Sequence, residues 1–291
     1  MITASMVKEL RTVTGAGMMD CKKALVEADG DMAKAVDILR ERGLSQAAKK
    51  ASRVAAEGAV VSYVSEDGKT GALVEVNCET DFVGQNENFQ TLATSIAEQI
   101  VSANPADVEE LLASDMKGKT VKEVVVEAIA NIGENISIRR FTRYESTDGE
   151  IFTYIHGGGK IGVLVEMKGA DAELGKDIAM QVAASNPSYM ERSEVSAEEI
   201  EHEKEILREQ ARNEGKPEDI IEKMVLGRVN KYYKEVCLLD QPFIKDADIS
   251  ITKLLKSKNA EAVRFSRFQL GEGIEKRQDN LAEEVAKQIN Q

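Results

Sequence analysis

The sequence predicts an α+β protein built from two related modules, and two observations support this. Strand-like segments at residues 62–64 and 71–76 recur 91 positions later, at 153–155 and 162–167, and the helix-like segment 96–100 recurs at 178–182, only 82 positions later. Apolar residues also change from a helical to a strand period after Gly58. Strands paired with helices, twice over, are typical of a duplicated α+β body.

The two offsets differ because the first copy has about nine additional residues between its second strand and its helix. Additional residues in a repeated module usually extend a loop, and loops on rigid scaffolds often carry function. This insertion contains Thr80, Asp81, Phe82 and Val83, which are candidate partner-binding residues. Phe82 is either an apolar anchor for a partner, with a carboxylate beside it, or a side chain that folds back onto its own sheet.

The N-terminal part, residues 1–54, predicts a three-helix head followed by a linker. The first helix is expected at residues 5–12, before a Thr-Gly-Ala-Gly turn at 14–17. The next two helices have apolar residues at i, i+3, i+4 and i+7, starting at Cys21 and at Met32. Asp31 is the expected N-cap of the third helix and Gly43 its C-terminal stop.

The body has strand patterns at residues 59–64, 72–78, 136–144, 151–156, 161–167 and 263–270. Helices are expected between them at 86–102, 120–132 and 172–184, the second opened by a capping box of Thr120 and Glu123. These elements predict a first core module at 55–145 and a second at 146–190 with 237–275. A C-terminal helix is expected at 276–291.

Residues 191–236 predict an antiparallel helical hairpin that projects from the body; the alternative is that it packs on the sheet. Ser196 and Glu199 form a second expected capping box. The expected apolar stripes, on either side of a Gly-Lys-Pro turn at 215–217, are Ile200, Leu207 and Ala211, then Leu226, Val229, Tyr233 and Val236.

Charge and composition exclude several function classes. The net charge is −13, which argues against a nucleic-acid groove, although residues 1–54 carry ten basic and seven acidic side chains. A slightly basic head on an acidic body is compatible with a protein partner or with an ordinary solvated surface. The chain has only three cysteines and two histidines, widely spaced, so we expect neither a metal site nor a disulfide framework. Without a signal peptide or a long apolar run, we expect an intracellular, cytoplasmic protein that does not span a membrane.

Catalytic motifs are weak. Residues 157–160, Gly-Gly-Gly-Lys, lack the Ser or Thr and the earlier glycine of a phosphate-binding loop. We therefore expect no enzymatic activity and no cofactor. His156, beside these glycines, either caps a hairpin turn or contacts a partner. Met18 and Met19 lie where a loop meets a helix, and one of them should face outward as an adaptable contact.

Several blocks of the sequence resemble bacterial translation elongation factor Ts. The blocks span almost the whole chain and are highly specific when taken together. They are residues 10–25 (with Thr-Gly-Ala-Gly-Met-Met-Asp-Cys-Lys-Lys), 75–83 (Glu-Val-Asn-Cys-Glu-Thr-Asp-Phe-Val), 156–157, 162–165, 215–217, 241–243 and 271–276.

The resemblance implies a guanine-nucleotide exchange factor for elongation factor Tu, in which a ubiquitin-associated-like head docks on the partner's GTPase domain. It places Arg11, Met18 and Met19 at the head's interface. It makes Asp81 and Phe82 the intruding pair, with Asp81 disturbing the partner's Mg²⁺. His156 and Ile244 would be further contacts, while Lys245 departs from the family's pattern. A homodimer or a 2:2 complex with the partner is compatible with this.

Two other classes of function compete with the exchange factor. A structural or chaperone-like scaffold would self-associate through the helical hairpin and bury Phe82 in its core. A phosphate-binding enzyme would be centred on residues 157–160 and would bind nucleotide by itself. The three functions differ in whether a GTPase of translation, a second copy or a nucleotide co-purifies with the chain.

Overall fold

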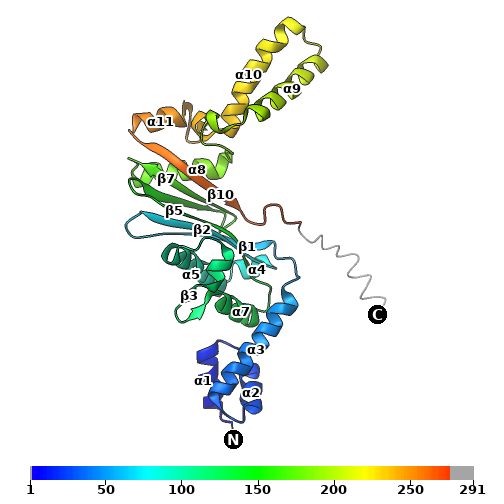
Figure 1. Ribbon diagram of the computed structural model, residues 1–291, viewed down its shortest axis with the longest axis vertical. Helices are drawn as coiled ribbons and strands as arrows, with labels where there is room; N and C mark the ends of the chain where they lie inside the picture. Colours follow the sequence, from blue (N-terminus) through cyan, green and yellow to red (C-terminus); the bar gives the residue numbers. More distant parts are fainter. Residues whose placement is uncertain (1, 276–291) are drawn as a thin grey trace, which may run out of the picture.

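The computed structural model describes residues 2–275, so the C-terminal helix expected at 276–291 lies outside the described residues. The molecule is long, with three N-terminal helices at one end, two stacked sheets in the middle and a pair of helices at the other end (Figure 1). This mixture of helices and small antiparallel sheets confirms the α+β class.

The N-terminal helices are α1 (Ala4–Thr14), α2 (Met18–Glu27) and α3 (Met32–Lys50). Their shared core contains Leu10, Cys21, Leu25 and Ala35. As predicted, the Asp31 side chain accepts a hydrogen bond from the Lys34 N–H at 3.1 Å and caps α3.

The prediction that Gly43 ends α3 is wrong, because the helix continues to Lys50. Gly43 is buried where α3 lies on α7 (Val121–Ile132), and a Cβ there would be 3.5 Å from the Cβ of Ala130. The glycine therefore lies within the packed contact between α3 and α7 and does not stop the helix. Through this contact the second half of α3 joins the head to the first module.

The first module has the strand order β1–β2–β5, all antiparallel: β1 (Glu57–Val64), β2 (Thr70–Cys78) and β5 (Ser137–Glu145). Its outer face is covered by α5 (Glu87–Ala103) and α7, with α4 (Asp81–Gly84), α6 (Val108–Ala113) and the short strands β3 (Asp115–Met116) and β4 (Lys119–Thr120) alongside. The capping box of Thr120 and Glu123 at the start of α7 is confirmed.

The second module repeats this order as β6 (Glu150–His156), β7 (Ile161–Lys168) and β10 (Glu261–Gln269), with β7 central. Helix α8 (Ala172–Ser185) covers its outer face, and β8 (Pro242–Phe243), β9 (Asp246–Ser250) and α11 (Ile251–Ser257) complete it.

The two sheets face each other across a small apolar layer. This layer contains Val60, Leu73, Tyr144, Ile151 and Leu164. Gly71 and Gly162, equivalent positions of the internal repeat, lie in it too. A Cβ at Gly71 would be 2.6 Å from Ile151, and a Cβ at Gly162 would be 2.5 Å from Val60. Both positions lack a side chain because the opposite sheet fills the space.

Residues 197–236 form two helices, α9 (Ala197–Asn213) and α10 (Glu218–Val236), which pack on each other beyond the second module (Figure 1). Two short 3₁₀ turns, η1 (Arg192–Glu194) and η2 (Leu238–Asp240), lie at their base. The expected place of Leu226 in the seam is wrong: Leu226 is exposed, and the buried stripe of α10 is Ile221, Val225 and Val229.

Only one of the two hydrogen bonds of the capping box predicted at Ser196 and Glu199 is present. Ser196 accepts the Glu199 N–H at 3.1 Å, but the Glu199 carboxylate accepts hydrogen bonds from Tyr232 and, at 2.6 Å, from Tyr189. These bonds lower the pKa of Glu199. Glu199 thus ties the base of the two helices together instead of closing the box.

Candidate partner-binding site

The insertion in the first module folds into a short helix and not an open loop. Eight residues separate β2 from α5, against three between β7 and α8, and α5 is also longer, with 17 residues against 14. Thr80 is the N-cap of α4, because its Oγ1 accepts the Val83 N–H at 3.3 Å. The additional residues therefore build a one-turn helix on the edge of the module.

Phe82 lies on the outer side of α4 and is 84% exposed, the largest exposed fraction among the large apolar side chains of residues 2–275. The alternative in which it folds back onto its own sheet is therefore wrong. Asp81 beside it is exposed, while Val83 packs against the module's core. Helix α4 thus presents one aromatic ring and one carboxylate to the surroundings and is attached by its opposite side.

Helix α4 lies directly on the start of β1. Gly84 is buried, and a Cβ there would be 2.8 Å from the carbonyl oxygen of Gly58. The β6–β7 turn contacts the same strand two residues farther on, where the carbonyl of Gly159 accepts the Val60 N–H at 2.8 Å. The first residues of β1 therefore bring together α4, which carries Phe82, and the turn that follows His156.

His156 is exposed at the end of β6, and its Nδ1 is 3.1 Å from the hydroxyl of Tyr154. The three glycines that follow it have φ values of 60°, 67° and 96°. Left-handed conformations of this kind favour glycine and explain the composition of the turn. The turn leads into strand β7 and not into a helix, so it does not present a helix N-terminus to a phosphate group.

The backbone at the start of α4 is held by Glu134, which the sequence did not indicate. Its Oε2 accepts the N–H groups of Glu79 and Thr80, both at 3.0 Å, and its Oε1 accepts the Thr80 hydroxyl at 2.7 Å. In return the Glu79 carboxylate accepts the Asn135 N–H at 2.7 Å. Two segments about 55 residues apart in the sequence thus exchange hydrogen bonds.

Cys78 joins the same contact region. Its thiol donates a hydrogen bond to the carbonyl of Thr80 at 3.1 Å. Burial raises the pKa of Cys78 to about 12, and the negative charge of Glu134 adds to this effect. The thiol therefore remains protonated and acts as a buried donor below α4, and not as a nucleophile.

Three other predicted site residues lie in the head. Arg11 is exposed near the end of α1, and both Met18 and Met19, at the start of α2, are exposed rather than only one of them. Val13, also exposed, lies close to them in the sequence. The head is separated from α4 by the length of α3 and α7 (Figure 1), so the structure does not bring these residues next to Phe82.

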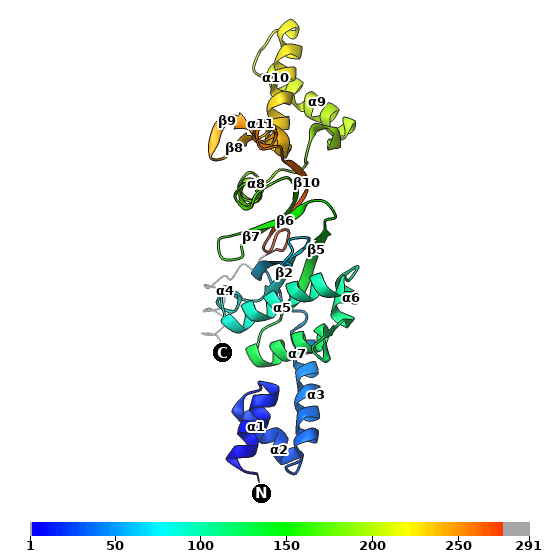
Figure 2. The same ribbon diagram turned by 90° about the vertical axis from the view of Figure 1, so that its left-hand side faces the viewer.

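Ile244 follows β8 in the second module and is 42% exposed, with its N–H donated to the buried Gln181 side chain at 2.8 Å. It is also far from Phe82 in the sequence. The elements α1, α4, β8 and β9 nevertheless lie along the same side of the molecule, on the left in Figure 2. The predicted residues thus come from elements spread along the length of the molecule and do not form a single pocket.

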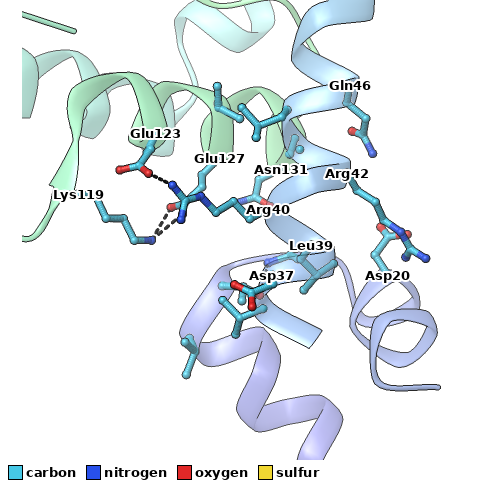
Figure 3. Close-up of a pocket in the computed structure, with 18 of the residues that line it drawn as sticks. Asp20, Asp37, Leu39, Arg40, Arg42, Gln46, Lys119, Glu123, Glu127 and Asn131 are labelled. Atoms are coloured by element: carbon cyan, nitrogen blue, oxygen red, sulfur yellow. Dashed lines mark hydrogen bonds and ion pairs between the residues drawn. The ribbon is translucent and has the colours of Figure 1, made fainter. Parts of the chain in front are cut away.

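A cavity of about 460 Å³ lies elsewhere, between the head and α7 (Figure 3). Arg40 of α3 pairs with Glu123 of α7 across it, and Lys119 pairs with Glu127 at 2.6 Å on the side of the first module. None of the predicted site residues lines it. The cavity is the crevice where the head meets the first module, bridged by the Arg40–Glu123 ion pair.

The described part of the chain has neither a cluster suited to a metal ion nor a membrane-spanning helix. Over residues 2–275, no group of three or more His, Cys, Asp or Glu side chains is arranged to hold a metal ion. In that same part of the chain, no helix combines the length and apolar character needed to cross a bilayer. The three cysteines are free and buried.

Comparison with known proteins identifies related sequences over the whole chain. A family model described as "Elongation factor TS" matches residues 79–272. The chain is 57% identical to an elongation factor Ts of Clostridium perfringens (strain SM101 / Type A) over 299 aligned positions, covering 99% of both chains. It is 56% identical to that of Clostridium novyi (strain NT), covering 100% of both, and 54% identical to that of Clostridium botulinum (strain Alaska E43 / Type E3), covering 99% of both.

Proposed function

Because this chain belongs to the elongation factor Ts family of translation elongation factors, we propose that it is a guanine-nucleotide exchange factor that binds elongation factor Tu·GDP and promotes GDP release. GTP can then reload the partner during translation elongation. The factor itself makes and breaks no covalent bond and needs no cofactor.

The exposure of Phe82 is the observation that supports this proposal most strongly. A bare aromatic ring costs free energy in water, and large exposed apolar side chains beside a charge are common in interface hot spots. Helix α4 packs on strand β1 of a packed sheet, so the Phe82 ring is held on a rigid support. A protruding ring on a rigid support is suited to entering another protein.

The physical effect on the partner follows from how a GTPase holds GDP. The nucleotide is bound by a phosphate-cradling loop and by a Mg²⁺ ion whose ligands lie on mobile switch segments. The Phe82 ring, wedged beside that pocket, displaces the neighbouring helices, and the Asp81 carboxylate disturbs the Mg²⁺ ligands. Because coupling between two ligands is reciprocal, nucleotide binding weakens the factor's grip equally, and GTP releases it.

The remaining predicted residues serve as docking contacts in this proposal. Arg11, Met18 and Met19 present the ubiquitin-associated-like head, residues 1–54, to the partner's GTPase domain. His156 and Ile244 contact the partner from the second module, residues 146–190 and 237–275. Thr80 and Val83, which were also predicted to contact the partner, instead hold α4 to the first module, residues 55–145. Residues 191–236 form a hairpin arm that is not among the docking contacts.

The test measures release of fluorescent GDP from elongation factor Tu by stopped flow. Phe82→Ala should slow the stimulated release at least about tenfold, which corresponds to ~1.4 kcal/mol of lost coupling. Leu226→Ala is the matched control, since Leu226 is also an exposed apolar side chain on a helix but lies on the distant arm. Release at the wild-type rate by a folded Phe82→Ala protein contradicts the proposal.

A further inference from the structure

We propose that Glu134 is a positioning residue for nucleotide exchange: it fixes the direction in which α4 presents Phe82 to the partner. This inference rests on the proposed function above and names a residue through which that function acts. Glu134 itself faces the backbone of residues 79 and 80 and is not expected to touch the partner.

Helix α4 cannot hold its own direction. It has four residues, and a single helical turn is unstable alone because fixing the backbone costs more than one hydrogen bond returns. Its orientation must therefore come from its attachments. On the inner side these are Val83 in the core and Gly84 against Gly58. At the N-terminal end the attachments are the Glu134 carboxylate, with three hydrogen bonds, and the Cys78 thiol, with one to the Thr80 carbonyl.

Glu134 uses both of its carboxylate oxygens to hold residues 79 and 80. Its two oxygens accept three hydrogen bonds, from two successive N–H groups and from the Thr80 hydroxyl. Hydrogen bonds to a carboxylate are shorter and stronger than those between neutral groups. The same Thr80 hydroxyl oxygen accepts the Val83 N–H and caps α4, so the carboxylate also fixes the rotamer of the capping side chain.

Glu134 is itself held on a rigid element. It follows Gly133, whose φ of 92° ends helix α7 in a left-handed cap. On its other side, the N–H of Asn135 is bound by Glu79 and its side-chain amide donates to the carbonyl of Arg53 at 2.9 Å. The direction of α4 is therefore fixed relative to α7 and to the end of the head's linker.

The chemistry of the site predicts a graded series of variants. Glu134→Gln retains one oxygen for the two N–H groups and can turn its amide nitrogen toward the Thr80 hydroxyl oxygen. Glu134→Ala loses all three contacts and leaves two N–H groups without their acceptor. The order of activity should be wild type, then Gln, then Ala. Glu110→Ala is the matched control, because Glu110 lies in the same module and also accepts a backbone N–H, that of Ala106 at 2.8 Å.

The experiment measures GDP release from elongation factor Tu over a range of factor concentrations. Glu134→Ala should lower the saturating release rate roughly fivefold, equivalent to ~1 kcal/mol. The concentration for half-maximal effect should change little, since the docking contacts are intact. In the isolated factor, the amides of residues 81–84 should exchange with solvent faster, while those of α5 should be unchanged.

A double-mutant cycle with Phe82→Ala decides whether Glu134 acts through the ring. Once the ring is absent, adding Glu134→Ala should slow release by much less than it does in the wild-type background, because only the contribution of Asp81, on the same helix, is left to lose. An equal additional loss in the Phe82→Ala background overturns the inference, as does a wild-type saturating rate for Glu134→Ala. Should Glu134→Ala fail to fold, Glu134→Gln carries the same comparison.

These outcomes separate this inference from the proposed function. If Phe82→Ala releases GDP normally, the proposed function fails whatever Glu134 does. If Phe82→Ala is slow and both Glu134 variants are normal, the exchange function stands and the positioning role is rejected.

Discussion

Glu75 of β2 and Glu166 of β7 occupy equivalent positions of the internal repeat, and each accepts a hydrogen bond from the Nε of an arginine opposite it on the neighbouring strand. Arg140 of β5 lies 2.7 Å from Glu75, and Arg264 of β10 lies 2.6 Å from Glu166. The internal repeat therefore extends to the ion pairs and not only to the apolar pattern.

The two arginines also cross between the modules. Arg140 lies over the ring of Phe268 at 4.4 Å, and Arg264 lies over the ring of Tyr144 at 4.2 Å. Each module thus supplies the cation for an aromatic ring of the other. This reciprocal exchange joins the outer strands β5 and β10 and helps to hold the two sheets as one scaffold.

Glu75 should matter more to stability than Glu166. It is fully buried and also accepts hydrogen bonds from the Gly271 N–H at 2.8 Å and from Arg139 at 3.0 Å. We expect Glu75→Gln to lower the free energy of unfolding by about 3 kcal/mol at pH 7, the lower end for breaking a buried ion pair, because both arginines remain in contact with water. Glu166→Gln should cost clearly less.

The stabilisation of wild type over Glu75→Gln should depend on pH, and the pKa of Glu75 gives the direction of that dependence. Burial alone would raise the pKa of Glu75, but its hydrogen bonds from Gly271, Arg139 and other donors outweigh burial and lower it below 4.5. The stabilisation is therefore complete above pH 4.5 and is lost as the pH falls through the lowered, folded-state pKa. Urea unfolding of wild type and Glu75→Gln should converge at acidic pH; a difference that grows below pH 4.5 contradicts this.

Replacing Gly43 by alanine should stabilise the protein. Gly43 lies inside α3, where a Cβ would make ordinary contacts with Ala130 at 3.5 Å and Val126 at 3.7 Å. Alanine is favoured over glycine within a helix by ~1 kcal/mol. Calorimetry should show a higher melting temperature for Gly43→Ala. The contrasting control is Gly58→Ala, which should destabilise because its Cβ would be 2.2 Å from the carbonyl oxygen of Val76.

Gly43 also illustrates what the sequence could and could not predict. Strands and helices of the body follow from local periodicity and capping residues, and Thr120 and Asp31 cap the expected helices. Whether a helix ends at a glycine or continues past it depends on packing against a partner far along the chain, here α7. Leu226 was misplaced for the same reason, since either of two adjacent residues could face α9 and packing selects Val225.

At the candidate site, too, the sequence predicted some features and could not predict others. The internal repeat located the insertion and Phe82 within it, but exposure of the ring depends on how α4 sits on β1, which no local pattern encodes. Glu134 carried no signal in the sequence because its hydrogen-bond partners lie 54 and 55 residues away. Contacts of this kind are visible only once the chain is folded.

Cys78 should be protected from thiol reagents in the native protein. Its pKa is raised from 9.0 to about 12, chiefly by burial, so the thiolate fraction at pH 8 is about a thousandfold lower than for an ordinary cysteine. In a Cys21→Ser, Cys237→Ser background, where Cys78 is the remaining thiol, labelling by a chromogenic disulfide reagent should be slow and limited by opening of the structure. Adding denaturing urea should restore the rate of a free thiol. Fast labelling without urea would mean that α4 and the chain beneath it open readily, and would remove the firm base from which Phe82 is presented.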